Sequence, residues 1–226
     1  MGTVLSVIPC RGGSKGIPRK NIRPVAGKPL LEHTVRASLD SEIVDRTIVS
    51  TDDATIASIA EDAGADVPFT RPAELATDNA AIEPVIRHAI DFLSKSEGVS
   101  YDTILLLQVT SPLRTASHID EALTQYRESG ADSLVAVYED HSYRWTEQPD
   151  GATIVNYESR LRRQDKEPEY VESGAIYAVD VDRFVETGDL QSGKTTLFVL
   201  DSISALDIDR PFELWLADKI LTEWQT

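Results

Sequence analysis

The sequence is poor in sulfur, since its 226 residues include one cysteine, Cys10, and one methionine. A single cysteine excludes an intrachain disulfide and any metal site built from several cysteines. Cys10 stands next to a basic loop, and nearby cations can lower the pKa of a thiol and make it reactive. The alternative is a small buried side chain at the end of a strand. We favour this alternative because the sequence places no histidine partner beside Cys10.

Long apolar runs are also missing from the sequence. No stretch approaches the ~20 residues that a membrane-spanning helix needs. The first residues have neither the basic start nor the small-residue cleavage site of a signal peptide, because the apolar residues 4–8 lead directly into a basic loop. We therefore expect a cytoplasmic protein that does not act at a membrane.

Basic residues are scarce in this chain. It has 22 Lys and Arg against 38 Asp and Glu, which gives a net charge of −16. This balance argues against nucleic acid as a partner, since nonspecific binding needs a basic surface. Acidity with few lysines resembles proteins of a high-salt cytoplasm, although an ordinary acidic bacterial protein has the same composition. With 41% apolar and 27% charged residues, the chain is expected to form a single globular domain over residues 1–226.

Short apolar runs alternate with segments of helical periodicity along most of the chain. Such alternation predicts an α/β fold, with a mostly parallel sheet flanked by helices. The run at residues 103–107 is apolar throughout, which is typical of a strand buried on both faces. We expect strands at residues 4–8, 46–51, 103–107, 133–137, 174–179 and 196–200, and helices at residues 29–39, 54–63, 80–94, 117–128, 182–187 and 211–223.

The alternation stops between residues 138 and 171. This stretch is polar and aromatic, contains Trp145 and Tyr157, and has no helical period. More than thirty irregular residues are unusual inside a compact domain unless they project from it or carry a function. We interpret the stretch as an inserted, β-rich arm that contacts a partner subunit.

The first predicted strand opens into a basic glycine loop, residues 11–21. Its glycines let the backbone approach a ligand closely, and successive N–H groups in such a turn can bind an anion. The loop is neither a Walker A motif nor the dinucleotide G-x-G-x-x-G motif. Its order R-G-G-S-K-G-x-x-x-K-N fits a nucleotidyltransferase, in which cations neutralise the phosphates, better than a solvated basic turn. The four cations of the loop are Arg11, Lys15, Arg19 and Lys20.

Two carboxylates, Asp207 and Asp209, precede the last predicted helix. Side chains two residues apart in an extended chain point the same way, so both can face one cation. Mg²⁺ takes one or two carboxylates together with phosphate oxygens. Asp209 could instead be the N-cap of the helix.

Polar residues also follow the most buried predicted strand. Ligands of open α/β sheets bind outside the carboxyl ends of the strands. Gln108 stands at such an end and offers a donor and an acceptor for a base edge. Arg114 fits a structural role and a ligand role equally well. Arg71 is either a phosphate or ribose contact or part of a turn.

Together these pieces resemble the acylneuraminate cytidylyltransferase family, the CMP-sialic acid synthetases. The similarity runs along nearly the whole chain in the order of the family, and the first and last motifs are the most specific. The motifs are Ile8-Pro9 with residues 11–16 (RGGSKG), Lys20-Asn21, Ser50-Thr51-Asp52-Asp53, Arg71-Pro72 with Leu75-Ala76 and Asp78, Gln108 with residues 110–114 (TSPLR), Arg163-Gln164, residues 174–177 (GAIY), and Asp207-Ile208-Asp209 with Pro211.

The resemblance implies a nucleotide-diphospho-sugar transferase (Rossmann-like) fold, a homodimer whose arms cross, and Mg²⁺ as cofactor. It also implies the reaction of CTP with a 2-keto-3-deoxy-nonulosonic acid, an acidic nine-carbon sugar, to give a CMP-sugar and pyrophosphate. Carried over by position, Lys20, Arg11 and Asp209 would be catalytic. The nucleotide contacts would be Arg11, Gly13, Ser14, Lys15, Lys20, Asn21, Arg71 and Ala80; the sugar contacts Gln108, Arg163, Gln164 and Tyr177; and the metal ligands Asp207 and Asp209.

The sequence departs from the family at three positions. Cys10 replaces the usual Ala, Val109 the usual Pro, and Ser173 the usual Asn. The last change concerns a sugar-side contact, so the substrate could be a relative of sialic acid such as legionaminic or pseudaminic acid. Two alternatives stay open: a CMP-KDO synthetase-like activity on an eight-carbon keto acid, and a non-catalytic nucleotide-binding domain. No general base is evident, with Asp209 and bulk solvent as the candidates.

Overall fold

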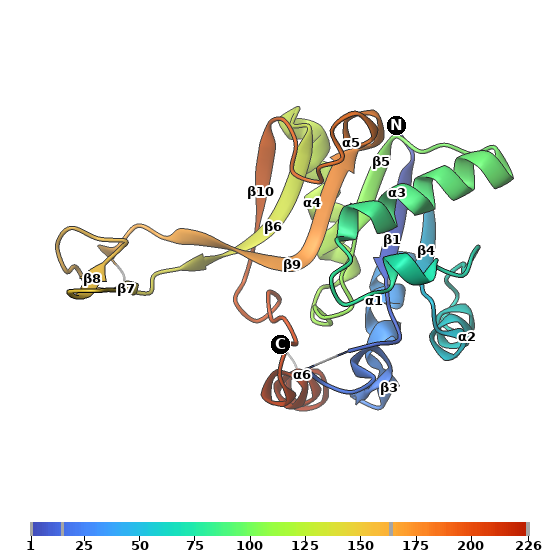
Figure 1. Ribbon diagram of the computed structural model, residues 1–226. Coiled ribbons are helices and arrows are strands. Elements are labelled where there is room, and N and C mark those ends of the chain that lie inside the picture. Colours follow the sequence, from blue (N-terminus) through green and yellow to red (C-terminus); the bar gives the residue numbers. More distant parts are fainter. Residues whose placement is uncertain (1, 15, 163–164, 225–226) are drawn as a thin grey trace.

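The body of the molecule is built on a six-stranded sheet with the strand order β10-β6-β9-β5-β1-β4 (Figure 1). The computed structural model describes residues 2–14, 16–162 and 165–224. The strands of the sheet are β1 (Val4–Pro9), β4 (Arg46–Ser50), β5 (Thr103–Leu106), β6 (Ser133–Asp140), β9 (Glu169–Asp180) and β10 (Thr195–Leu200).

The sheet is mostly parallel, as predicted. β1 lies parallel to both β4 and β5, and β10 lies parallel to β6. β9 is the exception, because it runs antiparallel between β5 and β6. Antiparallel neighbours can be joined without a crossover helix, and β9 returns directly from the segment that leaves β6.

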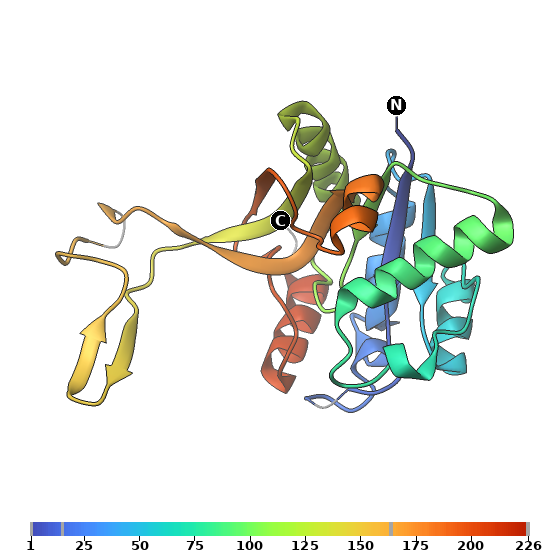
Figure 2. The same ribbon diagram turned by 45° about the horizontal axis from the view of Figure 1, so that its top comes forward.

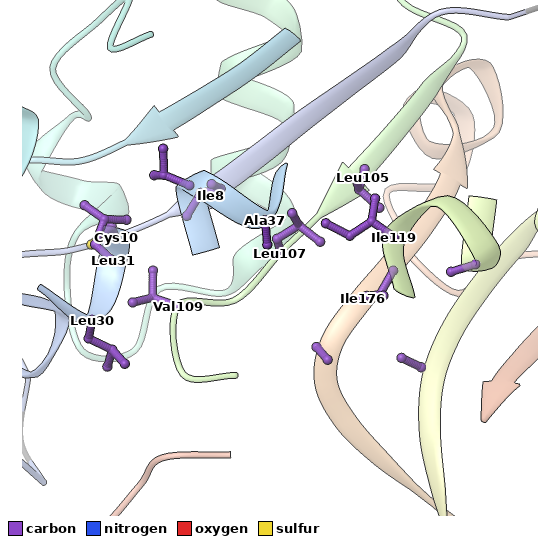
Figure 3. Close-up of a cluster of buried hydrophobic side chains, with 14 of the residues drawn as sticks. Ile8, Cys10, Leu30, Leu31, Ala37, Leu105, Leu107, Val109, Ile119 and Ile176 are labelled. Carbon is purple, nitrogen blue, oxygen red and sulfur yellow. The ribbon is translucent and has the colours of Figure 1, made fainter. Parts of the chain in front are cut away.

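Helices cover both faces of the sheet. Alternate side chains of each strand enter one of two buried clusters: on β1, Val4 and Ile8 face the first cluster and Leu5 and Val7 the second. Figure 3 shows side chains of the first cluster, and Figure 2 shows α3 lying across the opposite face. The first cluster includes residues of α1 (Leu30–Leu39), α2 (Ala54–Asp62), α4 (Ala116–Ser129) and α6 (Pro211–Glu223), and the second includes residues of α3 (Ile82–Phe92) and α5 (Val181–Thr187).

The outer halves of β6 and β9 leave the body as a two-stranded ribbon (Figure 1). A separate hairpin of β7 (Trp145–Gln148) and β8 (Gly151–Ile154) follows at its far end. Every residue of this hairpin is exposed. We use the name arm for residues 138–171, which include the hairpin.

The ends of the helices follow the sequence signals closely. Asp53 caps α2, as its carboxylate accepts hydrogen bonds from Thr55 N at 2.8 Å and Ile56 N at 3.1 Å. The helix predicted at residues 80–94 differs, because α3 ends at Phe92 and continues as a π-helical turn, Leu93–Glu97. Shorter pieces are the 3₁₀ turns Lys20–Ile22 and Ala73–Leu75 and the small ladder of β2 (Pro24–Val25) and β3 (Lys28–Pro29). In the described ranges, no helix has the length and apolar character required to cross a membrane.

Candidate active site

A pocket of about 310 Å³ lies at the carboxyl ends of β1 and β5. One wall is the basic glycine loop, and the opposite wall comes from the residues before α3 and its first turns. The pocket is therefore at the sheet edge where open α/β folds bind ligands. Its lining includes eight of the predicted site residues, Arg11, Gly13, Ser14, Lys20, Asn21, Arg71, Ala80 and Gln108.

Lys20 is largely buried, with only 14% of its side chain exposed. Its Nζ donates a hydrogen bond to the Ile208 carbonyl at 2.5 Å and lies 3.5 Å from Asp209 Oδ1. These contacts join the glycine loop to the acidic segment near the C-terminal end of the chain. A ligand phosphate in the pocket would meet an ammonium whose position is already fixed.

Arg11 stands at the mouth of the pocket. Its Nη1 pairs with Asp78 Oδ1 at 2.7 Å, which bridges the glycine loop and the turn before α3. The Arg11 side chain is 30% exposed, so the pair is accessible to water and to competing anions. Exposed pairs of this kind contribute about 0–1 kcal/mol and are easily exchanged for another anion.

The predicted metal ligands Asp207 and Asp209 lie beside Lys20, and they differ in environment. Asp207 Oδ1 is buried and makes no hydrogen bond within the described residues. Burial raises the pKa of Asp207, the neighbouring Thr110 hydroxyl and the Lys20 ammonium oppose the shift, and the charge of Asp209 adds to it. Asp209 is largely exposed.

A buried, unpartnered carboxylate oxygen beside a second carboxylate suits a hard cation such as Mg²⁺. The described residues include no group of three or more His, Cys, Asp or Glu side chains that could hold a metal ion. A cation bound by Asp207 and Asp209 would therefore take its remaining ligands from water or a bound phosphate, as Mg²⁺ commonly does.

The alternative interpretation of Asp209 as a helix N-cap is wrong. Arg210 occupies the N-cap position of α6. The side chain that accepts the free N–H groups is Glu213, whose carboxylate binds Asp209 N at 2.8 Å and Arg210 N at 2.5 Å. The Asp209 carboxylate is therefore not used by the helix.

Gln108 lines the pocket, and its side-chain amide lies beside an irregular part of β9. The pairing of β6 and β9 shifts register near Gly174, which has a φ of +72°. A Cβ at Gly174 would lie 2.8 Å from Gln108 Oε1, so any larger residue would displace this amide from its present position. Tyr177, another predicted sugar contact, is buried in the second cluster. Its hydroxyl donates to Glu172, and it is not among the residues that line the pocket.

Ser173, where the family has Asn, turns toward the backbone. Its Oγ donates to the Ala136 carbonyl at 3.1 Å and accepts from Ala175 N at 3.3 Å, and the residue is buried. These two bonds give hydrogen-bond partners to a backbone carbonyl of β6 and a backbone N–H of β9, where the pairing of the two strands is irregular. The substitution therefore gives no direct indication of which sugar is bound.

Two arginines and the cysteine are engaged in the interior. Arg71 lines the pocket, yet its guanidinium binds Ser50 Oγ at 3.1 Å and the Ser50 carbonyl. Arg114 lies away from this pocket and donates to the Ala175 carbonyl at 2.7 Å, and burial lowers its pKa to about 9. Burial raises the pKa of Cys10, so the structural interpretation of this thiol is confirmed.

Comparison with known proteins assigns the chain to a family. The profile of the family described as cytidylyltransferase matches residues 5–196. The chain belongs to the cytidylyltransferase family. It is accordingly a nucleotidyltransferase.

Individual relatives agree with this assignment. The cytidylyltransferase is 36% identical over 231 residues to the CMP-N,N'-diacetyllegionaminic acid synthase of Legionella pneumophila, with 96% of each chain covered. It is 32% identical to the N-acylneuraminate cytidylyltransferase of Escherichia coli, covering 95% of this chain but only 51% of that protein. The chain thus spans about half the length of the E. coli relative.

Solved structures share the fold. A CMP:2-keto-3-deoxy-manno-octonic acid synthetase complexed with CTP superposes with a TM-score of 0.71 at 16% identity, covering 99% of this chain and 100% of that one. A 4-diphosphocytidyl-2C-methyl-D-erythritol synthase gives a TM-score of 0.69 at 14% identity, covering 98% and 100%. At these identities the comparison shows the common fold alone, which confirms the predicted fold.

Some residues of the cytidylyltransferase pocket were not among the predicted site residues. Thr110 lines it, with its buried hydroxyl beside Asp207, and its carbonyl accepts from Ile208 N at 2.9 Å. Ile82 and Val85 of α3 form an apolar wall. The helical pattern of α3 marked these positions as apolar, but it does not say whether they face a ligand or the core. The predicted site residues Lys15, Arg163 and Gln164 lie outside the described residues.

Proposed function

We propose that this cytidylyltransferase transfers the cytidylyl group of CTP to a 2-keto-3-deoxy-nonulosonic acid and releases pyrophosphate. The observation that carries the proposal is the convergence of the glycine loop, Lys20 and Gln108 on one pocket beside Asp207 and Asp209. The names of the L. pneumophila and E. coli relatives support the acidic nine-carbon sugar as acceptor. Sialic, legionaminic and pseudaminic acids are the candidate substrates.

The triphosphate would lie along the glycine loop. The backbone at Gly13 and Ser14 faces the pocket, and Arg11 and Lys20 supply positive charge on either side of it. Asn21 stabilises the backbone of the loop, since its Nδ2 donates to the Arg11 carbonyl at 3.1 Å. Fixed cations that meet charge developing on phosphates are a general means of accelerating such transfers.

The reaction is an in-line displacement. The oxygen of the anomeric hydroxyl attacks the α-phosphorus of CTP, and the bond from that phosphorus to the bridging oxygen breaks. Pyrophosphate leaves with the electron pair of this bond, and the hydroxyl proton passes to bulk water or to Asp209. The work of the protein is positioning and charge neutralisation.

Asp207 and Asp209 would hold Mg²⁺, which when bound supplies positive charge to the phosphates. Lys20 lies against the same segment through the Ile208 carbonyl. The two carboxylates and this ammonium would therefore act on the same part of the nucleotide. Arg71, bound to Ser50, would border the nucleotide at the far side of the pocket.

The sugar side would be completed by a second copy of the chain. Gln108 faces the pocket, and Tyr177 lies on β9, the strand that continues into the arm. The arm's hairpin is wholly exposed, and an isolated two-stranded hairpin is marginally stable in water at best. A homodimer in which the arm packs on the partner would bury it and bring Arg163 and Gln164 toward a sugar acid.

A panel of sugar acids incubated with CTP tests the proposal, with pyrophosphate release as the readout. Sialic, legionaminic and pseudaminic acids are compared with the eight-carbon acid KDO, with and without Mg²⁺. Turnover of a nine-carbon acid in the presence of Mg²⁺ is expected. Turnover of KDO alone would establish the eight-carbon activity instead, and no pyrophosphate across the panel would favour a non-catalytic nucleotide-binding domain. Undiminished turnover in a chelator would reject the magnesium site.

A further inference from the structure

The segment Ser50 to Asp53 lies at the end of β4 and lines no part of the pocket, although it is one of the motifs of the family. Two of its members have evident structural tasks. The Ser50 carbonyl accepts from Cys10 N at 2.9 Å, and Asp53 caps α2. Asp52 is exposed and neither caps the helix nor faces the pocket, so its carboxylate calls for another explanation.

Asp52 binds the glycine loop at its first glycine. Its Oδ1 accepts a hydrogen bond from Gly12 N at 3.0 Å. The loop passes very close to this turn, because a Cβ at Gly12 would lie 2.9 Å from Asp53 Oδ2. A glycine at position 12 is therefore what allows Asp52 to reach the backbone.

The bond has a counterpart on the same peptide unit. Gly12 N and the Arg11 carbonyl belong to one planar peptide, with N–H and C=O pointing in opposite directions. Asn21 Nδ2 holds the carbonyl at 3.1 Å, while Asp52 holds the N–H at 3.0 Å. Both bonds oppose rotation of this peptide plane, which orients the backbone of the loop on either side of it.

We propose that Asp52 is a positioning residue, which presets the phosphate-binding conformation of the glycine loop by holding the Arg11–Gly12 peptide plane. The inference rests on the proposed function, since it assumes that the loop binds the triphosphate. A preformed loop binds without first having to be ordered, and ordering would otherwise reduce the affinity. The role depends on an acceptor atom at position 52 and not on its charge.

Three variants separate positioning from general stability. Asp52→Ala removes the acceptor, and Asp52→Asn keeps an acceptor oxygen but removes the charge. Asp189→Ala is the matched control, because Asp189 is another exposed aspartate that accepts one backbone hydrogen bond, from Gln191 N at 2.9 Å, away from the pocket. Binding of CTP with Mg²⁺ is measured by titration calorimetry, the steady-state constants for CTP and sugar acid by pyrophosphate release, and Tm by thermal unfolding.

Loss of the hydrogen bond to Gly12 N should weaken CTP binding about tenfold in Asp52→Ala, with the KM for the sugar acid unchanged. Asp52→Asn should stay within about threefold of the wild type, and Asp189→Ala should bind CTP normally whatever its Tm. Normal CTP binding by Asp52→Ala, or equally weak binding by Asp52→Asn, would overturn the inference. A wild-type protein that binds no CTP would overturn the proposed function and, with it, the role of Asp52. This result is distinguishable from the others because it is seen in the wild type and not in a variant.

Discussion

Lys20 is the side chain on which the proposed chemistry depends most. Its ammonium is largely buried and bound to the Ile208 carbonyl, so this side chain connects two parts of the chain that are distant in sequence. The loop motif in the sequence predicted Lys20 as a site residue. The partner on the acidic segment could not be foreseen, because the contact spans 188 residues.

Replacing Lys20 by Ala should leave the fold intact and abolish measurable pyrophosphate release from CTP and sugar acid. Removal of one donor that stabilises developing charge typically lowers kcat by roughly a hundredfold or more. Pyrophosphate release and far-UV circular dichroism are the measurements. Lys219→Ala, an exposed lysine on α6, is the control. Near-normal turnover of the Lys20 variant would contradict the assigned role.

Gly174 offers a second test at the scale of one residue. Alanine there must adopt a φ of +72°, which costs about 1–2 kcal/mol of stability, and its Cβ must also displace Gln108. Gly98 has a φ of +69° and open space around it, so Gly98→Ala carries the same backbone cost without that displacement. Both variants should lose similar stability in urea unfolding, whereas only Gly174→Ala should lose roughly tenfold in kcat/KM for the sugar acid. Equal kcat/KM values for the sugar acid in the two variants would contradict a contact between Gln108 and the sugar.

Residue-level prediction succeeded where a motif carries a chemical requirement and failed where a role depends on packing. Predicted residues of the glycine loop and Gln108 line one pocket at the carboxyl ends of the strands. Ser173 and Arg114, by contrast, turn to backbone carbonyls that sequence spacing cannot identify. The same holds for Asp209, whose cap role passes to Glu213.

At the scale of elements, periodicity predicted most helices and strands but not their pairing. The range of α6 was predicted without error, and β10 begins one residue earlier than expected. The antiparallel course of β9 was not predicted. Its apolar pattern resembles that of a buried parallel strand, because both faces of β9 are covered in the body. Strand direction depends on the connection through the arm, which has no local signature.

The packing of α4 against the sheet gives a pH-dependent prediction. Burial, together with the charges of Asp180 and Asp132, raises the pKa of Tyr126 from 10.0 to about 12, and its hydroxyl donates to the Asp132 carbonyl at 3.1 Å. In the unfolded chain the phenol ionises near its ordinary pKa, while in the folded protein it stays neutral. The stability that this residue contributes is therefore complete below pH 10 and declines as the pH rises to about 12.

Tyr126→Phe removes this contribution. The wild type should be more stable than the variant by about 1 kcal/mol at pH 8, the usual value of one hydrogen bond, and the difference should shrink as the pH rises above 10. Urea unfolding at several pH values measures both proteins. Stability curves that stay parallel from pH 8 to 11.5 would contradict the assignment.

At the scale of the whole molecule, the arm leaves apolar surface unprotected. Trp145 is 58% exposed, and the rest of the hairpin is exposed with it. Burial of a large aromatic side chain often dominates the energy of an interface. The proposed homodimer therefore depends strongly on this one residue.

Sedimentation analysis should find the wild-type protein as a dimer, and Trp145→Asp should raise its dissociation constant by roughly tenfold or more. Val185→Asp, which changes an exposed apolar side chain on α5 in the body, is the control and should stay dimeric. A monomeric wild type, or a Trp145 variant that associates as well as the control, would remove the basis for the partner's role at the sugar side.

The arm departs on β6 and returns on β9, and within the body these two strands are hydrogen-bonded neighbours. An insertion with adjacent ends can be lengthened, shortened or replaced without moving the elements on either side of it. The glycine loop and the acidic pair lie on other connections of the sheet. Evolution can therefore exchange the arm while the nucleotide half of the pocket stays as it is, and under the proposed function such an exchange would change the acceptor.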